Sequence, residues 1–122
     1  MAETPNILIA DDDPILRETL HGHLSDQGYD VIAAADGEKA LAHLKGKRFH
    51  LVIIDIKMPK VDGFQLLEYV KENLPSTKAI MLTGYADLKN VEKCRKLGAD
   101  DVIAKPYDLG DLLDAISLVM KK

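Results

Sequence analysis

The segment that most constrains the fold is Leu51–Asp55, in which four consecutive apolar residues lead directly into an aspartate. An uninterrupted apolar run of this length is typical of a strand buried on both faces, as in a parallel sheet covered by helices. A buried helix segment would also be apolar, but the run is short, and Pro59 and Gly63 soon follow it. Asp55 is therefore expected where a buried strand ends, and a carboxylate there requires a cation or hydrogen-bond donors nearby.

Apolar segments of strand type alternate with amphipathic segments of helix type along the chain. The expected strands cover residues 6–10, 30–34, 51–55, 78–83 and 101–104, and an expected helix follows each of them. Asp13 is expected to cap the first helix, with Pro14 in its first turn. Five strands alternating with five helices indicate right-handed βαβ units, and hence a doubly wound α/β fold with a parallel sheet. The chain has no internal repeat or linker, so we expect one domain over residues 1–122.

The composition argues against several classes of function. The 122 residues are 47% hydrophobic and 30% charged, with a formal net charge of −4, which gives no electrostatic reason to expect direct binding to nucleic acid or a membrane surface. No run of about 18 apolar residues and no signal peptide is present, so the expected location is the cytoplasm. The single cysteine, Cys94, excludes an internal disulfide and is expected to be a packed thiol.

Polar residues follow four of the five expected strands. Asp11 and Asp12 follow the first, Asp55 ends the third, Thr83 follows the fourth and Lys105 follows the fifth. In an open doubly wound sheet, ligands bind beyond the carboxyl ends of the strands, near the point where the strand order reverses. If the first and third strands are neighbours, the three carboxylates converge at that edge.

Converging carboxylates need a counter-charge, because like charges raise one another's pKa values. Oxygen ligands without histidine or cysteine favour Mg²⁺ over zinc. Lys105 would add a fixed positive charge and Thr83 a hydroxyl. Metal, ammonium and hydroxyl together would suit a phosphoryl group, which a central carboxylate can accept as nucleophile.

Four segments of the sequence together resemble the receiver domain of bacterial two-component response regulators. They are residues 7–14 (ILIADDDP), residues 55–59 (DIKMP) with Asp62 and Gly63, residues 81–84 (MLTG) and residues 104–107 (AKPY). Each segment alone is a weak signal, but all four occur in order and at the spacing of the family. The resemblance covers nearly the whole chain.

The resemblance implies a flavodoxin-like sheet with strand order 2-1-3-4-5. It makes Asp55 the acceptor of a phosphoryl group from the phosphohistidine of a sensor histidine kinase or a phosphotransfer protein. It implies that Asp12, Asp55 and the backbone carbonyl of Lys57 bind Mg²⁺ directly, and that Asp11 acts mainly through water. The chain would catalyse only its own phosphorylation and dephosphorylation, and would switch a downstream effector domain or protein.

The resemblance also assigns roles to the other residues at the strand ends. Thr83 and Lys105 would contact the phosphoryl oxygens, and Gly84 would leave room for the donor histidine. The Lys105–Pro106 bond would be cis, a state available mainly to proline.

One position departs from the family pattern. Many family members have an aromatic switch residue three positions before the lysine, where this chain has Val102. Valine has no large rotamer change to offer, so we expect the output to depend more on movement of residues 83–87. Lys57 and Tyr85, each two residues past a site residue, are expected to shield the acyl phosphate and slow its hydrolysis.

Some residues are expected to lie away from the phosphoryl site. The four histidines are assigned no role in phosphotransfer: His21, His23, His43 and His50. By helical-wheel position, Leu118 faces away from the apolar stripe of the last helix. Family members commonly form dimers or meet partners through their last two helices, so Leu118 with Ala115 is a candidate contact in a homodimer or with a partner.

Three other functions compete with this one. An aspartate-nucleophile phosphatase of the haloacid-dehalogenase type needs an acid two residues after the nucleophile, where this chain has Lys57, and usually a cap domain. A flavin carrier needs a phosphate loop after the first strand, where the aspartates would repel phosphate. A degenerate receiver would act as an interaction module without phosphorylation, although every phosphorylation residue is present. The chain itself could be a complete regulator or the receiver of a longer protein.

Overall fold

Strands and helices alternate in the computed structural model, which describes residues 4–58, 60–84, 88–105 and 107–121. The strands are β1 (Asn6–Ala10), β2 (Asp30–Ala34), β3 (Leu51–Asp55), β4 (Lys78–Gly84) and β5 (Asp101–Lys105). The helices are α1 (Pro14–Asp26), α2 (Gly37–Gly46), α3 (Gly63–Asn73), α4 (Leu88–Lys96) and α5 (Leu109–Met120). β4 and β5 each extend one residue beyond the expected strand, so Gly84 and Lys105 belong to the sheet.

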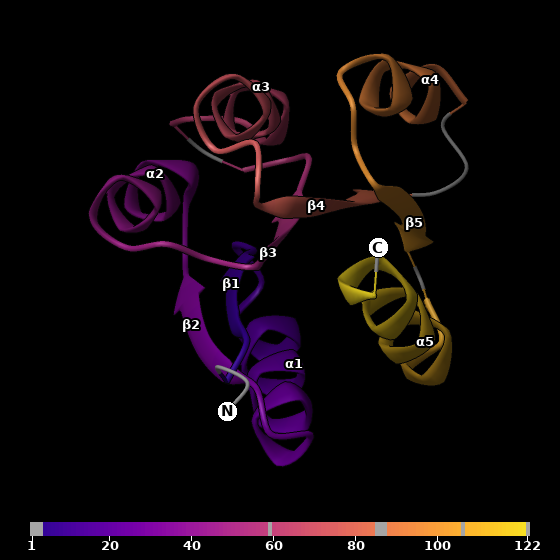
Figure 1. Ribbon diagram of the computed structural model, residues 1–122. Coiled ribbons are helices and arrows are strands. Elements are labelled where there is room, and N and C mark those ends of the chain that lie inside the picture. The colour runs from indigo at the N-terminus through magenta and orange to yellow at the C-terminus, as the bar shows by residue number, and fades with distance from the viewer. Residues whose placement is uncertain (1–3, 59, 85–87, 106, 122) are drawn as a thin grey trace.

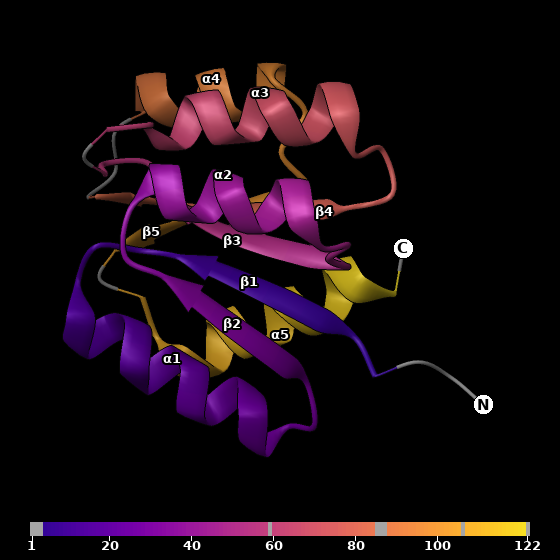
Figure 2. The ribbon, with the colours of Figure 1, turned by 90° about the vertical axis from the view of Figure 1, so that its left-hand side faces the viewer.

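The strands form one parallel sheet in the order β2-β1-β3-β4-β5, which confirms the predicted architecture. Helices α2, α3 and α4 cover one face of the sheet, and α1 and α5 cover the other (Figures 1 and 2). β3 lies in the middle and is buried at every position. The unbroken apolar run of β3 therefore reflects burial by helices on both faces.

Alternate residues of the central strands supply two separate cores. One core lies toward α2, α3 and α4 and includes Leu8, Val52, Ile54, Met81, Leu66 and Val70. The other lies toward α1 and α5 and includes Ile9, Leu51, Ile53, Leu82, Leu20 and Ile116. Cys94 is fully buried in the first core, and burial raises the pKa of its thiol, as expected of a packed cysteine.

Aspartates begin four of the helices. Asp13 accepts hydrogen bonds from the amides of Ile15 and Leu16, which confirms it as the N-cap of α1. The equivalent caps of α2, α3 and α5 are Asp36, Asp62 and Asp108. The caps satisfy amides that the helix itself cannot pair. In the described part of the chain, no helix has the length and apolar character needed to cross a membrane.

Candidate metal centre

The sheet register brings the site residues together at the carboxyl ends of the strands. β1 and β3 are neighbours, with Ala10 opposite Ile54. The ladder continues past both strand ends, since the amide of Asp11 donates to the carbonyl of Ala34 at 3.2 Å and that of Ile56 to the carbonyl of Leu82 at 3.0 Å. These backbone bonds hold the two strand-end aspartates, one from each strand, at fixed positions.

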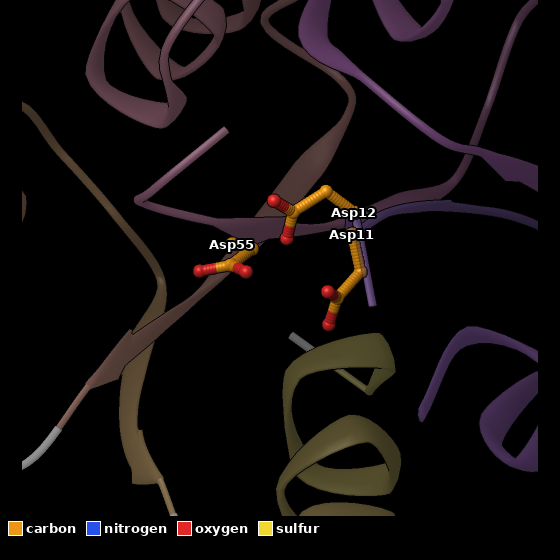
Figure 3. A group of neighbouring side chains, drawn as sticks. All are labelled: Asp11, Asp12 and Asp55. Atoms are coloured by element: carbon orange, nitrogen blue, oxygen red, sulfur yellow. The ribbon is translucent and has the colours of Figure 1, made fainter. Parts of the chain in front are cut away.

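Three carboxylates point into the same space at this edge (Figure 3). Asp11, Asp12 and Asp55 each offer an oxygen atom, and these atoms lie within 4.8 Å of one another. Asp11 and Asp55 are buried, whereas Asp12 is exposed. An all-oxygen donor set of this kind fits a hard divalent cation such as Mg²⁺. Asp12 leaves the group open to solvent on one side.

Lys105 lies against the two buried carboxylates. Its Nζ is 3.3 Å from Oδ2 of Asp11 and 3.1 Å from Oδ2 of Asp55. Burial raises the pKa of Asp55, and the charge of Asp11 adds to this effect while Lys105 opposes it. Burial alone would lower the pKa of Lys105, but the two carboxylates outweigh it and raise that pKa. The ammonium is therefore a stable counter-charge for the buried aspartates.

Thr83 is a buried hydroxyl without a partner. Its side chain is 0% exposed, and its Oγ1 has no hydrogen-bond partner among the described residues. A buried polar group left unpaired costs roughly 1–3 kcal/mol. Thr83 follows Leu82, the residue paired with Asp55 in the sheet. A bound group that carries an oxygen acceptor would satisfy this hydroxyl.

The segment that follows Asp55 contributes a backbone donor and a hollow. The amide of Lys57 donates to Oδ1 of Asp55 at 3.2 Å, and the Lys57 side chain is exposed. A hollow of about 490 Å³ opens beside Asp12 and Lys57. A Cβ atom on Gly84 would meet nothing within 4 Å, so the end of β4 is sterically open. These features match the sequence expectations in position, and the functional roles of the residues stay predictions.

Several expectations concern residues outside the described part of the chain. These are the shielding role of Tyr85, the part of the expected movement of residues 83–87 that lies beyond Gly84, and the geometry of the Lys105–Pro106 bond. Val102 is described, and it packs half-buried against the core beneath α2, α3 and α4. None of the four histidines belongs to the carboxylate group. They lie on α1 (His21 and His23), on α2 (His43) and directly before β3 (His50).

Sequence reasoning assigned no role to two residues that border the site. Nη1 of Arg17 donates to the carbonyl of Asp11 at 2.9 Å. The hydroxyl of Tyr107 is buried, with no hydrogen-bond partner in the part of the chain that the structure describes. Burial, followed by the charges of Asp11, Asp13 and Asp55, raises its pKa to about 12. A position in the first turn of α1 was the available signal for Arg17. The burial of the Tyr107 hydroxyl depends on packing between separate elements, which no local sequence pattern encodes.

The chain is similar to known proteins over nearly its whole length. A family model described as the response regulator receiver domain matches residues 7–117. The crystal structure of a CheY-like response regulator receiver domain protein from Methanospirillum hungatei JF-1 superposes with a TM-score of 0.92 at 37% identity, covering 98% of this chain and 95% of that one.

Two curated relatives differ in how much of their length the chain matches. The probable transcriptional regulator ycf27 of Porphyridium aerugineum is 39% identical over 116 residues, covering 95% of this chain and 48% of that protein. Sporulation initiation phosphotransferase F of Bacillus subtilis (strain 168) is 34% identical over 110 residues, covering 90% and 89%. The chain spans about half the length of the first relatives. Fold, carboxylate group and similarity agree: the chain belongs to the receiver-domain family of two-component response regulators.

Proposed function

We propose that this receiver domain accepts a phosphoryl group on Asp55 from the phosphohistidine of a sensor histidine kinase or a phosphotransfer protein, in a Mg²⁺-dependent reaction. One observation carries the proposal. The Lys105 ammonium lies 3.1 Å from Asp55, inside a group of three carboxylates whose oxygens lie within 4.8 Å of one another. A carboxylate beside a fixed cation, with further oxygen ligands for a metal, is suited to act as a phosphoryl acceptor.

The three carboxylates are proposed to play different roles at the metal. Oδ1 of Asp11 accepts the amide of Asp13 at 2.9 Å, and Oδ2 interacts with Lys105 at 3.3 Å. Asp55 is engaged in the same way, since its Oδ1 accepts the amide of Lys57 at 3.2 Å and its Oδ2 contacts Lys105 at 3.1 Å. The water-mediated contact proposed for Asp11 and the direct contacts proposed for Asp12 and Asp55 therefore follow the family resemblance. Bound Mg²⁺ would neutralise the negative charge that the carboxylates and the phosphoryl oxygens bring together.

The transfer exchanges one bond to phosphorus for another. The bond between phosphorus and the histidine nitrogen breaks with its electron pair remaining on nitrogen, and a bond forms to a carboxylate oxygen of Asp55. Lys105 neutralises charge on the phosphoryl oxygens, and Thr83 donates its hydroxyl hydrogen to one of them. The backbone carbonyl of Lys57 completes the proposed set of metal ligands. Gly84 leaves space for the histidine ring of the donor.

The test is intact-mass measurement after incubation with acetyl phosphate, with and without Mg²⁺. The wild-type chain is expected to gain one phosphoryl group only with Mg²⁺, and Asp55→Ala to gain none. Asp114→Asn, which removes an exposed carboxylate of α5, is the matched control and should label like wild type. A gain that survives in Asp55→Ala would show that the nucleophile is another residue.

That experiment, together with a phosphorylated kinase domain as donor and an assay of phosphate-ester hydrolysis, separates the alternatives. A degenerate receiver would gain no mass from acetyl phosphate or from a phosphorylated kinase domain. An aspartate-nucleophile phosphatase would turn over a phosphate ester, which requires a general acid that Lys57 does not supply. The presence of every phosphorylation residue favours the phosphoryl acceptor over both.

Lys57 is also proposed to prolong the phosphorylated state. Its exposed side chain begins two residues after Asp55, and with Tyr85 it would shield the acyl phosphate from water. Lys57→Ala should therefore lose its phosphoryl group faster than wild type, measured by phosphate release. A marked slowing in that variant would contradict the shielding role.

The output is proposed to pass to an effector domain or protein in the cytoplasm, and α4 and α5 are the candidate surface for a homodimer. Leu118 supports this surface, because it is a large apolar residue that is 65% exposed on α5. The wild-type chain and Leu118→Glu are compared by analytical ultracentrifugation before and after phosphorylation. A dimer that forms on phosphorylation and is lost in Leu118→Glu is expected, and identical sedimentation of both proteins would end the idea.

A further inference from the structure

The segment between Asp55 and α3 contains a backbone conformation that the carboxylate group does not explain. Lys60 has a φ of 70°, and no other described residue except glycine has a positive φ. The left-handed region is unfavourable for a residue with a side chain, and such a residue persists where its surroundings hold it there. The contacts of Lys60 and its neighbour Val61 therefore show what shapes this segment.

The first turn of α2 presses directly against the segment. A Cβ atom on Gly37 would lie 1.7 Å from the carbonyl oxygen of Val61 and 2.6 Å from its carbonyl carbon. No side chain fits between the two backbones at this point. Glycine is therefore required at residue 37 by the close approach of α2 to the segment that follows the acceptor.

Lys60 faces two carboxylates on the same turn of α2. Its Nζ lies 3.8 Å from Oδ2 of Asp36 and 3.9 Å from Oε2 of Glu38. The other oxygen of Asp36 accepts the amide of Lys39 at 2.8 Å. Asp36 thus caps α2 and attracts Lys60 at the same time, which couples the start of this helix to the strained residue.

The other side of the segment lies against the backbone of Asp55 and Ile56. The amide of Gly63 donates to the carbonyl of Ile56 at 3.0 Å, and a Cβ atom on Gly63 would lie 2.5 Å from the carbonyl oxygen of Asp55. Lys57, whose carbonyl is the proposed metal ligand, lies in the sequence between Asp55 and Lys60. Lys60 and Val61 are therefore held by α2, and Gly63 by the backbone of Asp55 and Ile56, with Lys57 between these attachments in the sequence.

We propose that Gly37 and Lys60 are positioning residues of the metal site: α2 sets the position of the Lys57 carbonyl relative to the Asp55 carboxylate. This inference rests on the proposed function and adds residues outside the ligand set to it. Mg²⁺ requires near-ideal octahedral geometry at short distances, so a small displacement of one ligand weakens binding. Residues that orient metal ligands affect affinity although they do not touch the metal.

The first test compares two identical substitutions in α2. Gly37→Ala forces the helix and the segment apart, whereas a Cβ atom on Gly46 meets nothing within 4 Å, so Gly46→Ala is the matched control. Calorimetric titration with MgCl₂ should give a Kd about tenfold higher for Gly37→Ala and an unchanged Kd for Gly46→Ala. Labelling by acetyl phosphate in Gly37→Ala should return to the wild-type rate at saturating Mg²⁺, a recovery that general loss of structure would not show.

The second test keeps the fold intact if Gly37→Ala does not fold. Glycine adopts a positive φ without strain, so Lys60→Gly removes only the side chain that reaches Asp36 and Glu38. Lys60→Gly should bind Mg²⁺ more weakly, and Lys60→Arg, which keeps the cation, should bind it like wild type. Equal Mg²⁺ affinity in Gly37→Ala and Gly46→Ala, or in Lys60→Gly and wild type, would overturn the proposal. Failure of the proposed function is a separate result, in which wild type itself neither binds Mg²⁺ nor accepts the phosphoryl group.

Discussion

Two buried threonines mark the two ends of β4 and differ in how their hydroxyls are used. Thr77, just before the strand, is 2% exposed and donates its hydroxyl to the carbonyl of Phe49 at 2.7 Å. Thr83, near the end of the strand, is 0% exposed, and its hydroxyl has no partner among the described residues. The same side chain at similar burial is thus hydrogen-bonded at one end of β4 and unpaired, within the described part of the chain, at the other. Thr77 therefore contributes a hydrogen bond to the fold that Thr83 does not contribute.

The ion pairs at the two ends show the same contrast. Toward the amino ends of the strands, Asp100 binds the Lys71 ammonium at 3.0 Å and the amide of Ala79 at 2.8 Å, one cation for one anion. At the carboxyl ends, the one ion-pair cation of the carboxylate group among the described residues is Lys105, which contacts Asp11 and Asp55. That group keeps an excess of negative charge, which a divalent cation would balance. Polar or charged groups that are left without partners or counter-charges are expected at functional sites.

The Thr83→Val variant is expected to show the largest effect of the three, a lower rate of phosphorylation. Removal of a hydrogen-bond donor that stabilises developing negative charge should lower the rate of labelling by acetyl phosphate about 100-fold. The free energy of unfolding should stay equal or rise, because the hydroxyl that is lost has no partner among the described residues of the folded chain. Rates are measured by intact mass and stability by urea unfolding, with Thr83→Ser as the control that keeps the hydroxyl. A loss of stability without a loss of rate would reverse the assignment.

Thr77→Val should give the opposite result at the other end of β4. The carbonyl of Phe49 loses its donor in a buried place, so the free energy of unfolding should fall by about 2 kcal/mol. Labelling of the folded protein and its Mg²⁺ affinity should be unchanged. Urea unfolding followed by circular dichroism measures the first quantity. An unchanged free energy of unfolding would show that the hydrogen bond of Thr77 does not stabilise the fold.

The smallest effect is expected from Tyr107→Phe, which removes the second unpaired hydroxyl near the site. The variant should be more stable by about 1 kcal/mol at neutral pH, because a buried hydroxyl without a partner is replaced by hydrogen. The folded-state pKa of Tyr107 is about 12, above its ordinary value of 10.0, so the unfolded chain loses this proton first as the pH rises. Wild-type stability should therefore fall between pH 10.0 and about 12, and this part of the fall should be absent in Tyr107→Phe. Parallel stability curves for the two proteins would contradict the raised pKa.

The sequence predicted the elements and the candidate residues well, for physical reasons that are local. Strand and helix periods, the Asp13 cap and the polar residues after four strands all depend on neighbours a few positions apart. The strand order came from family resemblance, because alternation alone does not specify which strands pair. The one-residue extensions of β4 and β5 were missed because strand ends are decided by pairing with a neighbour.

The sequence by itself determined that this chain forms a parallel α/β sheet with Asp11, Asp12, Asp55, Thr83 and Lys105 at one edge, because periodicity and strand ends are written in adjacent residues. Only the tertiary structure decided that Lys105 lies between two carboxylates and that the hydroxyls of Thr83 and Tyr107 lack partners among the described residues. It also decided that α2 meets the backbone of Val61 at Gly37. These features depend on register and on how separate elements pack, so residues far apart in the chain determine them together.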